Sequence, residues 1–406
     1  MKKLFTTKNL TALCFLLLLL VKMVLGCRTL YYGAYQLLTT WRESHVLDIS
    51  GLEYLYNDGL PYKEYLLDLN GGFQRLLGMR CVNERYRLDN GQLTYIIPET
   101  DITGIADNTV AFSQALEELD IPFVYINTPF KIDPEDKQLP GGVEDYSNEN
   151  ADAFLSILAG NDVPYLDLRV LEKEQNLDHY AMYYVTDHHW TAEMGFWAYQ
   201  QITGYLAQQD ESFAVDPTLT DPDSYDYTVY PNIYLGSAGR RVGRLYAGLD
   251  DLTVITPKFD SKLQMEDPEN QVIRQGSYSE TALYQERLTG GSDYEASRYD
   301  VYCGGDRAMT CFTNYAREEN LTVQSQPKRL LVIKDSYSSV VAPFLALSYD
   351  EVCLLDLREY RQNVVEFARE YQPDMVLVLY NPGALESNNI KMFDFQIDPN
   401  NRSDEE

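Results

Sequence analysis

Hydrophobic runs of strand length alternate with segments of helical periodicity in two parts of the chain. The expected strands cover residues 121–126, 163–167, 329–333, 351–356 and 375–380. The expected helices cover residues 106–119, 148–159, 338–347 and 363–371. Alternation of strand and helix along the chain is typical of a parallel sheet. The pattern therefore predicts an α/β fold.

The middle of the chain follows a different pattern. Another helix is expected after Thr191, because Met194, Ala198, Ile202 and Leu206 fall on one helical face. From about 210 to 300, Asp, Gly, Pro and Tyr become frequent and long apolar runs disappear. Short alternating pieces in this stretch predict an irregular β-rich insertion, and loops mounted on a rigid sheet commonly form substrate surfaces. Near the N-terminal side, a hairpin is expected around 89–91.

The N-terminus carries an export signal. Lys2, Lys3 and Lys8 precede an apolar run over 10–21, and Cys27 closes the segment. A basic start followed by an apolar stretch marks secretion or membrane insertion. Residues 1–27 are therefore expected to be a signal anchor or a signal peptide, with the anchor preferred over cleavage and lipidation at Cys27. Either outcome places the body of the protein, 28–396, outside the cell membrane and attached to it.

The charge of the chain limits the classes of partner. The formal net charge of −29 excludes nucleic-acid binding through a basic footprint. A neutral or cationic substrate is expected, unless a local basic patch such as Arg240, Arg241 and Arg244 serves the site. The C-terminal residues 397–406 read as an acidic, disordered tail. Four cysteines outside the targeting segment permit disulfides that the sequence does not assign, namely Cys81, Cys303, Cys311 and Cys353.

Two short motifs carry candidate chemistry. Asp187-His188-His189-Trp190 holds two of the four histidines of the chain. Lys334-Asp335-Ser336-Tyr337-Ser338 lies between an expected strand and an expected helix, where a serine hydroxyl meets backbone N–H groups. Asp187, His189 and Ser336 are the types that a nucleophilic triad needs. The plain alternatives are a helix-capping serine and a structural histidine. A metal site at the histidine pair ranks below both readings.

These motifs resemble those of the DHHW family of bacterial exported proteins, whose name matches the run at 187–190. The resemblance extends to Gly236-Ser-Ala-Gly239, Gly304-Gly305-Asp306 and the segment 331–337. The family is similar to the SGNH-hydrolase-like domains of alginate O-acetyltransferases, in which an Asp-x-His pair precedes the serine. The resemblance implies an SGNH-hydrolase-like three-layer sandwich with a parallel central sheet and a circularly permuted motif order.

Carried over residue by residue, the resemblance implies that Ser336 is the nucleophile, His189 the base and Asp187 the acid that orients it. His188 becomes a spacer, and Trp190 is expected to floor the cleft. The usual glycine before the Asp-Ser pair is replaced by Lys334.

The residues that hold the oxyanion or the substrate are harder to assign. Candidates are the Ser336 N–H, Tyr337, Arg358, Tyr380 and Asn381. Asp356-x-Arg358 also fits a structural ion pair, and Asn381-Pro382-Gly383 fits an ordinary turn.

The resulting hypothesis is a membrane-anchored extracytoplasmic enzyme that needs no cofactor or metal. It is expected to be an O-acetyltransferase of a cell-surface polysaccharide, working through an acyl-enzyme and a membrane partner protein that delivers the acyl group. A non-catalytic carbohydrate-binding or polysaccharide-assembly protein and a carbohydrate esterase are the alternatives. The enzyme hypothesis predicts the Ser336 hydroxyl within hydrogen-bond reach of the His189 ring and Asp187 beside the other ring nitrogen.

Overall fold

The computed structural model describes residues 62–316 and 327–395, together with scattered positions between 12 and 42. The chain divides into two compact units, Met1–Asn70 and Gly71–Glu406. The described positions of the first unit before residue 43 are helical. Among all described residues, no helix has both the length and the apolar character that a membrane crossing requires. The expected export segment 1–27 falls mostly outside the described residues, and the expected tail 397–406 falls outside them entirely.

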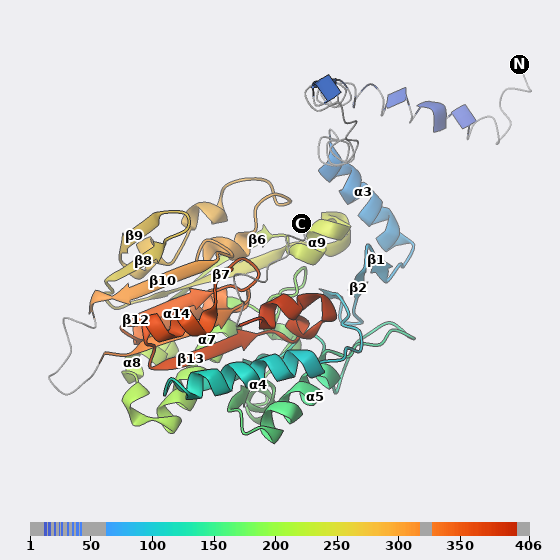
Figure 1. Ribbon diagram of the computed structural model, residues 1–406. Coiled ribbons are helices and arrows are strands. Elements are labelled where there is room, and N and C mark those ends of the chain that lie inside the picture. The colour runs from blue at the N-terminus through green and yellow to red at the C-terminus, as the bar shows by residue number, and fades with distance from the viewer. Residues whose placement is uncertain are drawn as a thin grey trace, which may run out of the picture. The chain divides into compact units, whose positions relative to one another are not determined.

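An eight-stranded sheet forms the centre of the second unit (Figure 1). Its order is β5 (Tyr165–Asp167), β4 (Phe123–Asn127), β13 (Met375–Tyr380), β11 (Arg329–Lys334), β12 (Glu351–Leu355), β10 (Met309–Asn314), β8 (Leu263–Asp267) and β9 (Val272–Gly276). The first five strands run parallel to one another, as the sequence pattern predicted, and the last three pair in antiparallel fashion. The sheet is therefore mostly rather than entirely parallel.

Helices cover both faces of the parallel part. Along β11, Leu330 and Val332 join one hydrophobic cluster, whereas Leu331 and Ile333 join another. The first cluster contains α7 (Ala192–Gln209) and α13 (Ser338–Ser348), and the second contains α4 (Thr103–Glu117), α5 (Ser147–Gly160) and α14 (Val364–Tyr371). Because strands covered on both faces must be apolar at every position, their sequences read as continuous hydrophobic runs. The expected three-layer arrangement is present.

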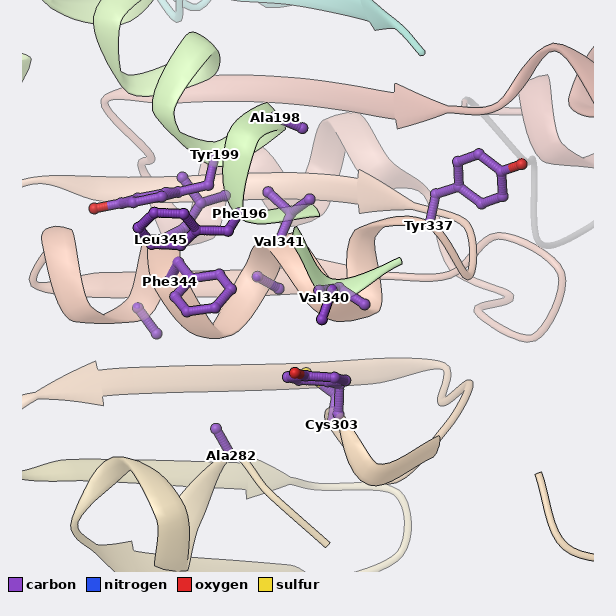
Figure 2. Packing of buried hydrophobic residues seen from close by; sticks show 14 of the residues in the cluster. Phe196, Ala198, Tyr199, Ala282, Cys303, Tyr337, Val340, Val341, Phe344 and Leu345 are labelled. Atoms are coloured by element: carbon purple, nitrogen blue, oxygen red, sulfur yellow. The ribbon is translucent and has the colours of Figure 1, made fainter. Parts of the chain in front are cut away.

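Helices α7 and α13 pack closely against each other (Figure 2). Phe196 and Tyr199 of α7 lie against Phe344 of α13, with ring centroids 5.0 and 5.6 Å apart. Gly195 permits this approach, since a Cβ at that position would lie 2.5 Å from a methyl group of Val340. Both helices start directly after one of the candidate motifs, so their packing brings the two motifs to the same end of the sheet.

The stretch where a β-rich insertion was expected contains strands of two different sheets. Strands β8 and β9 extend the central sheet, and β6 (Tyr225–Tyr234) pairs with β7 (Asp250–Pro257) in a separate ribbon. The short helices of this region include α8 (Pro217–Thr220), α9 (Ser237–Val242), α10 (Arg244–Ala247), α11 (Tyr278–Thr281) and the 3₁₀ helix η5 (Arg298–Val301). The region from 210 to 300 therefore contributes two strands to the central sheet and two to a separate ribbon.

The remaining elements are smaller. A three-stranded sheet, β1 (Cys81–Val82), β2 (Arg85–Arg87) and β3 (Leu93–Thr94), contains the expected hairpin. Three further helices are α3 (Lys63–Leu76), α6 (Leu168–Glu174) and the 3₁₀ helix η1 (His179–Met182). Cys311 and Cys353 stand opposite each other on β10 and β12 and form a disulfide, whereas Cys81 and Cys303 are free thiols.

Candidate active site

Ser336 lies at the carboxyl end of β11, two residues before α13 begins. Asp335 fixes the turn between them, because its carboxylate accepts hydrogen bonds from the Tyr337 N–H at 2.9 Å and the Asn381 N–H at 2.7 Å. The Asn381 side chain donates a third hydrogen bond to Asp335, at 2.6 Å. Asn381 follows β13, the neighbouring strand, so adjacent parallel strands together hold the serine turn. Ligand sites of open α/β sheets lie at this edge.

His189 meets Ser336 from the opposite motif. Its Nε2 atom is 2.7 Å from the Ser336 hydroxyl, and its Nδ1 atom is 3.1 Å from a carboxylate oxygen of Asp187. The second contact is an ion-pair distance without the alignment of a good hydrogen bond. Catalytic hydrogen bonds are often loose in the absence of substrate. The geometry predicted from the sequence, with His189 rather than His188 facing Ser336, is confirmed.

Asp187 is buried and has several donors around it. The Tyr234 hydroxyl donates to one carboxylate oxygen, and the Ser237 hydroxyl and the His188 N–H donate to the other at 2.7 Å each. Burial by itself raises the pKa of Asp187, but the rings of His189 and His188 hold it well below the usual value. The carboxylate therefore stays ionised beside His189, as a residue that stabilises an imidazolium must.

Tyr234 and Ser237 were missed by the sequence reasoning. Ser237 lies within the Gly236-Ser-Ala-Gly239 motif, which offered a signal, whereas nothing in the sequence pointed to Tyr234. Gly236 has a steric role in this motif. A Cβ at that position would lie 2.3 Å from the Asp187 Cβ and 2.6 Å from the Thr186 carbonyl oxygen. The glycine therefore allows the start of α9 to lie directly against the Asp187 segment.

Two buried charged side chains hold the backbone before His188. The Lys131 ammonium donates to the carbonyl oxygens of Asp187 at 2.6 Å and Leu93 at 2.7 Å, and also to that of Tyr184. Asp250 accepts from the N–H groups of Val185 and Thr186, both at 2.8 Å. Burial lowers the pKa of Lys131 to about 7. This irregular segment therefore gains from side chains the hydrogen bonds that a helix or sheet would supply.

Trp190 and Tyr337 link the two motifs. The Trp190 indole donates to the Tyr337 carbonyl oxygen at 3.1 Å, and the Tyr337 hydroxyl donates to the His188 carbonyl oxygen at 2.6 Å. Both side chains are fully buried. Trp190 therefore does not floor the cleft as expected, and Tyr337 is placed as a structural link rather than a substrate contact. Thr191 caps α7, the helix expected to follow it, by accepting a hydrogen bond from the Met194 N–H.

His188 does more than separate Asp187 from His189. Its Nδ1 atom lies 2.9 Å from the Ser237 hydroxyl and 2.9 Å from the Asp187 carboxylate. Burial and the neighbouring His189 lower the pKa of His188 to about 4. A neutral His188 therefore shares the carboxylate with His189 at neutral pH.

A cavity of about 270 Å³ opens beside Ser336 and His189. It is lined by His188, His189, Arg240, Ser297, Tyr299, Asp300, Tyr302, Gly305, Asp306, Ser336, Ser339 and Arg358. Of the four side chains named for oxyanion or substrate binding, the structure brings only Arg358 to this cavity. The Tyr380 hydroxyl donates to the Met392 carbonyl oxygen at 2.8 Å in the core. Asn381 is committed to Asp335, so both candidates are corrected to structural positions.

The wall of the cavity behind Ser336 is a network of charges. Asp306 lies 2.7 Å from the Lys334 ammonium and 2.8 Å from the Arg358 guanidinium. Arg358 also forms a two-pronged ion pair with Asp356, at 2.9 and 2.6 Å. Although burial opposes it, these cations lower the pKa of Asp306 to about 2. Lys334 thus replaces the expected glycine without blocking Ser336, because its side chain turns into this network.

Asp187, His188 and His189 also form a group whose ligand atoms lie close enough to hold a metal ion. Their lone pairs are already engaged, because both carboxylate oxygens accept hydrogen bonds and the His189 Nε2 atom faces Ser336. The arrangement suits proton transfer to and from a serine hydroxyl better than it suits coordination.

The protein thus combines a mixed α/β fold around a mostly parallel sheet with a Ser-His-Asp constellation at one end of that sheet. Residues 99–220 match the SGNH hydrolase-like domain of the acetyltransferase AlgX. Residues 168–355 match the DHHW protein family. The resemblance to the DHHW family, indicated by the sequence motifs, is therefore confirmed.

Solved structures agree on the fold. Two structures of PatB1 from Bacillus cereus, one with a sulfonyl adduct, each have a TM-score of 0.60 with this chain. They share 23% and 24% sequence identity, and the matches cover 76% of this chain and 97% and 98% of PatB1. A DHHW family protein from Eubacterium siraeum has a TM-score of 0.56 at 18% identity, covering 78% of this chain and 96% of its own. No curated protein sequence matches the chain.

Proposed function

We propose that the protein is an O-acyltransferase of the cell envelope that moves an acetyl group to a hydroxyl of a cell-surface polysaccharide. Ser336 is the nucleophile, His189 the general base and Asp187 the carboxylate that orients the ring. The observation that carries this proposal is the continuous chain of contacts from Asp187 through His189 to the Ser336 hydroxyl, which opens on a cavity. The match to a domain of the acetyltransferase AlgX supports acyl transfer as the reaction class.

In the first step, the Ser336 Oγ attacks the carbonyl carbon of the acyl donor while the His189 Nε2 takes the hydroxyl proton. The carbonyl oxygen gains the electron pair, and the Ser336 N–H, which has no hydrogen-bond partner among the described residues, donates to it. The N-terminal end of α13 favours negative charge at the same place. The leaving group then departs with the proton from His189, and an ester of Ser336 remains.

In the second step, a sugar hydroxyl gives its proton to the His189 Nε2 and attacks the Ser336 ester. The sugar ester departs, and the Ser336 oxygen takes the proton back from His189. Asp187 keeps its charge in both steps and stabilises the imidazolium that forms each time. Water in place of the sugar hydroxyl gives hydrolysis, so transferase and esterase differ only in the second acceptor.

The surroundings of this reaction belong to the same proposal. A basic and then apolar N-terminus supports attachment to the cell membrane, with the catalytic unit on the outer side. Acyl donors made in the cytoplasm need transport to such a site, so we propose a membrane partner protein that delivers the acyl group. A cell-surface glycan is the proposed acceptor.

The direct test is acyl-enzyme formation from p-nitrophenyl acetate. Wild type is expected to release a burst of p-nitrophenol equal to the enzyme concentration and to gain the mass of one acetyl group. Ser336→Ala is expected to lose the burst and at least about 10³-fold of the turnover. The matched control is Ser338→Ala, because the Ser338 hydroxyl donates to the Leu379 carbonyl oxygen and does not reach the cavity.

A second reagent tests the same serine. A structure of PatB1 contains a sulfonyl adduct, and sulfonyl fluorides react with activated hydroxyl groups. Phenylmethylsulfonyl fluoride is expected to label Ser336 of the wild type and to leave Ser336→Ala unlabelled. Glycan binding without any burst or labelling in the wild type would instead identify a binding protein. A burst followed only by acetate release, with no sugar ester formed, would identify an esterase.

A further inference from the structure

Of the four charged side chains that line the cavity outside the proposed triad, two form no ion pair among the described residues. Asp300 comes from η5 and Arg240 from α9, and both line the cavity with Ser336 and His189. Both elements belong to the insertion, which therefore supplies part of the wall of the site. The other charges of the cavity wall have partners, since Asp306 and Arg358 pair with each other and with Lys334 and Asp356.

Neighbouring residues fix the position of the Asp300 carboxylate. Its carboxylate lies against the Gly304-Gly305 turn, and a Cβ on Gly305 would be 3.1 Å from the carboxyl carbon. Gly305 has a φ of +96°, a conformation that L side chains rarely adopt. The glycine therefore leaves room for the carboxylate at the cavity. Within the described residues Asp300 forms no ion pair. Burial raises its pKa, whereas a hydrogen bond with Ser297, another residue of the cavity lining, and the charge of Arg287 act in the opposite direction.

Tyr299, the residue before Asp300, contacts the proposed triad directly. Its ring stacks on the ring of His189, with centroids 4.2 Å apart and planes 21° from parallel. A ligand held by Asp300 would consequently lie beside the imidazole that handles the proton. Arg240 has neither a hydrogen bond nor an ion pair through its guanidinium among the described residues, and its neighbour Arg241 does not line the cavity.

The chemistry of these two groups limits what fits between them. An ionised carboxylate only accepts hydrogen bonds, and a guanidinium only donates them. An anionic ligand would meet Asp300 and a cationic ligand would meet Arg240, each at the cost of a like-charge contact. Hydroxyl groups both donate and accept, so a neutral polyhydroxylated ring satisfies both residues. The cavity volume, at about 270 Å³, lies near the lower end of ligand sites and suits a single ring.

We propose that this cavity is the acceptor subsite for one uncharged sugar ring, in which Asp300 accepts a hydrogen bond from one hydroxyl and Arg240 donates to another. This inference rests on the proposed acyl transfer and adds the identity of the acceptor. Asp300 and Arg240 set the specificity of the second step. They hold the attacking hydroxyl beside His189, so that the acyl group passes to sugar in preference to water.

The test measures how the acyl-enzyme divides between sugar and water. The wild type is incubated with p-nitrophenyl acetate and one of three sugars: neutral methyl glucoside, anionic methyl glucuronoside or cationic methyl glucosaminide. The sugar ester and the free acetate are then measured by mass spectrometry. The ratio of ester to acetate is expected to be at least about tenfold higher for the neutral sugar than for either charged one. Asp300→Asn is expected to lower the neutral ratio about tenfold, because a hydrogen bond to a charged group is lost.

Each cavity variant should improve only the sugar whose charge its wild-type residue disfavours. A general structural effect would not distinguish between the two charged sugars. Asp300→Asn is expected to improve the uronate relative to the neutral sugar, and Arg240→Gln to improve the amino sugar. Glu286→Gln and Arg241→Gln make the same charge changes outside the cavity and are expected to keep the wild-type ratios. A wild type that prefers the uronate, or unchanged ratios in both cavity variants, would overturn the subsite.

These outcomes remain distinct from a failure of the proposed function. If the wild type shows no burst of p-nitrophenol, the proposed acyl-enzyme itself is rejected. A normal burst with unaltered selectivity in Asp300→Asn and Arg240→Gln would reject only the subsite.

Discussion

Ser336 and His189 reach one cavity from two regions that are held in place by different kinds of interaction. Ser336 follows a buried strand of a parallel sheet, and its turn is fixed by Asp335 and by Asn381 of the adjacent strand. His189 belongs to an irregular segment. Lys131, Asp250, Tyr234 and Ser237, which are distant in sequence, support that segment with side-chain hydrogen bonds.

The difference has an energetic consequence. A strand end is positioned by many backbone hydrogen bonds and apolar contacts, so one side-chain substitution removes a small part of its support. The Asp187 segment depends on a few buried polar groups, and each one that loses its partner leaves an unsatisfied group behind. The acid–base side of the site should therefore be more sensitive to substitution than the serine side.

The largest effect is expected for Asp187→Asn. Loss of the carboxylate removes the charge that stabilises the His189 imidazolium and orients its ring, so turnover of p-nitrophenyl acetate should fall about 10³- to 10⁴-fold. Steady-state kinetics with Ser336→Ala as the reference for zero activity measure this. A loss smaller than tenfold would mean that Asp187 is a structural residue and that His189 works without it.

Lys131→Met tests how strongly the Asp187 segment depends on its buried hydrogen-bond donors. The substitution leaves the carbonyl oxygens of Asp187, Leu93 and Tyr184 without their buried donor, and the free energy of unfolding should fall by about 3 kcal/mol. Asn381→Ala removes the side-chain support of the serine turn and should cost about 1 kcal/mol. Urea unfolding followed by circular dichroism gives both values. Equal losses would contradict the difference between the two regions.

Gly236→Ala tests the close approach of α9 to the Asp187 segment. A methyl group 2.3 Å from the Asp187 Cβ forces the two segments apart, at an expected cost of about 1–3 kcal/mol together with reduced activity. Gly204→Ala in α7 is the matched control, because its Cβ meets no atom within 4 Å. That control should be stable or stabilised, since alanine favours a helix. Thermal unfolding of both variants measures the contrast, and a tolerated Gly236→Ala would show that the contact can relax.

The smallest effect is expected for the pH dependence of His188→Asn. The pKa of His188 is about 4 in the folded protein and near 6.5 in an unfolded chain. Between these values only the unfolded state binds the proton, so stability falls as the pH is lowered from 6.5 to 4. Asp187 does not contribute to the pH dependence of stability between pH 6.5 and 4. Because its pKa is lowered in the folded protein, the stability that its ionised carboxylate provides is lost only below its ordinary pKa. His188→Asn should flatten the decline between pH 6.5 and 4.5 in urea titrations, and a parallel decline in both proteins would contradict the assignment.

The sequence by itself determined the regular part of this protein. Continuous apolar runs such as 329–333 and 375–380 identified strands buried on both faces, because every position of such a strand must be apolar. The position of Ser336 after a strand and before a helix followed from the same pattern, and the motif at 187–190 identified its partner. These features are local, so they can be read from neighbouring residues.

Only the tertiary structure decided what surrounds the triad. Lys131, Tyr234 and Asp250 carry no motif, and their contacts with the Asp187 segment span between 47 and 65 residues of sequence. Tyr380 and Asn381 were placed correctly at a strand end, but side-chain direction alternates along a strand and put Tyr380 in the core. The insertion looked irregular because β8 pairs with β10, a strand that follows it in the chain, and β9 joins the sheet only through β8. Such contacts depend on which distant residues meet in space, and the sequence around each residue does not determine its distant partners.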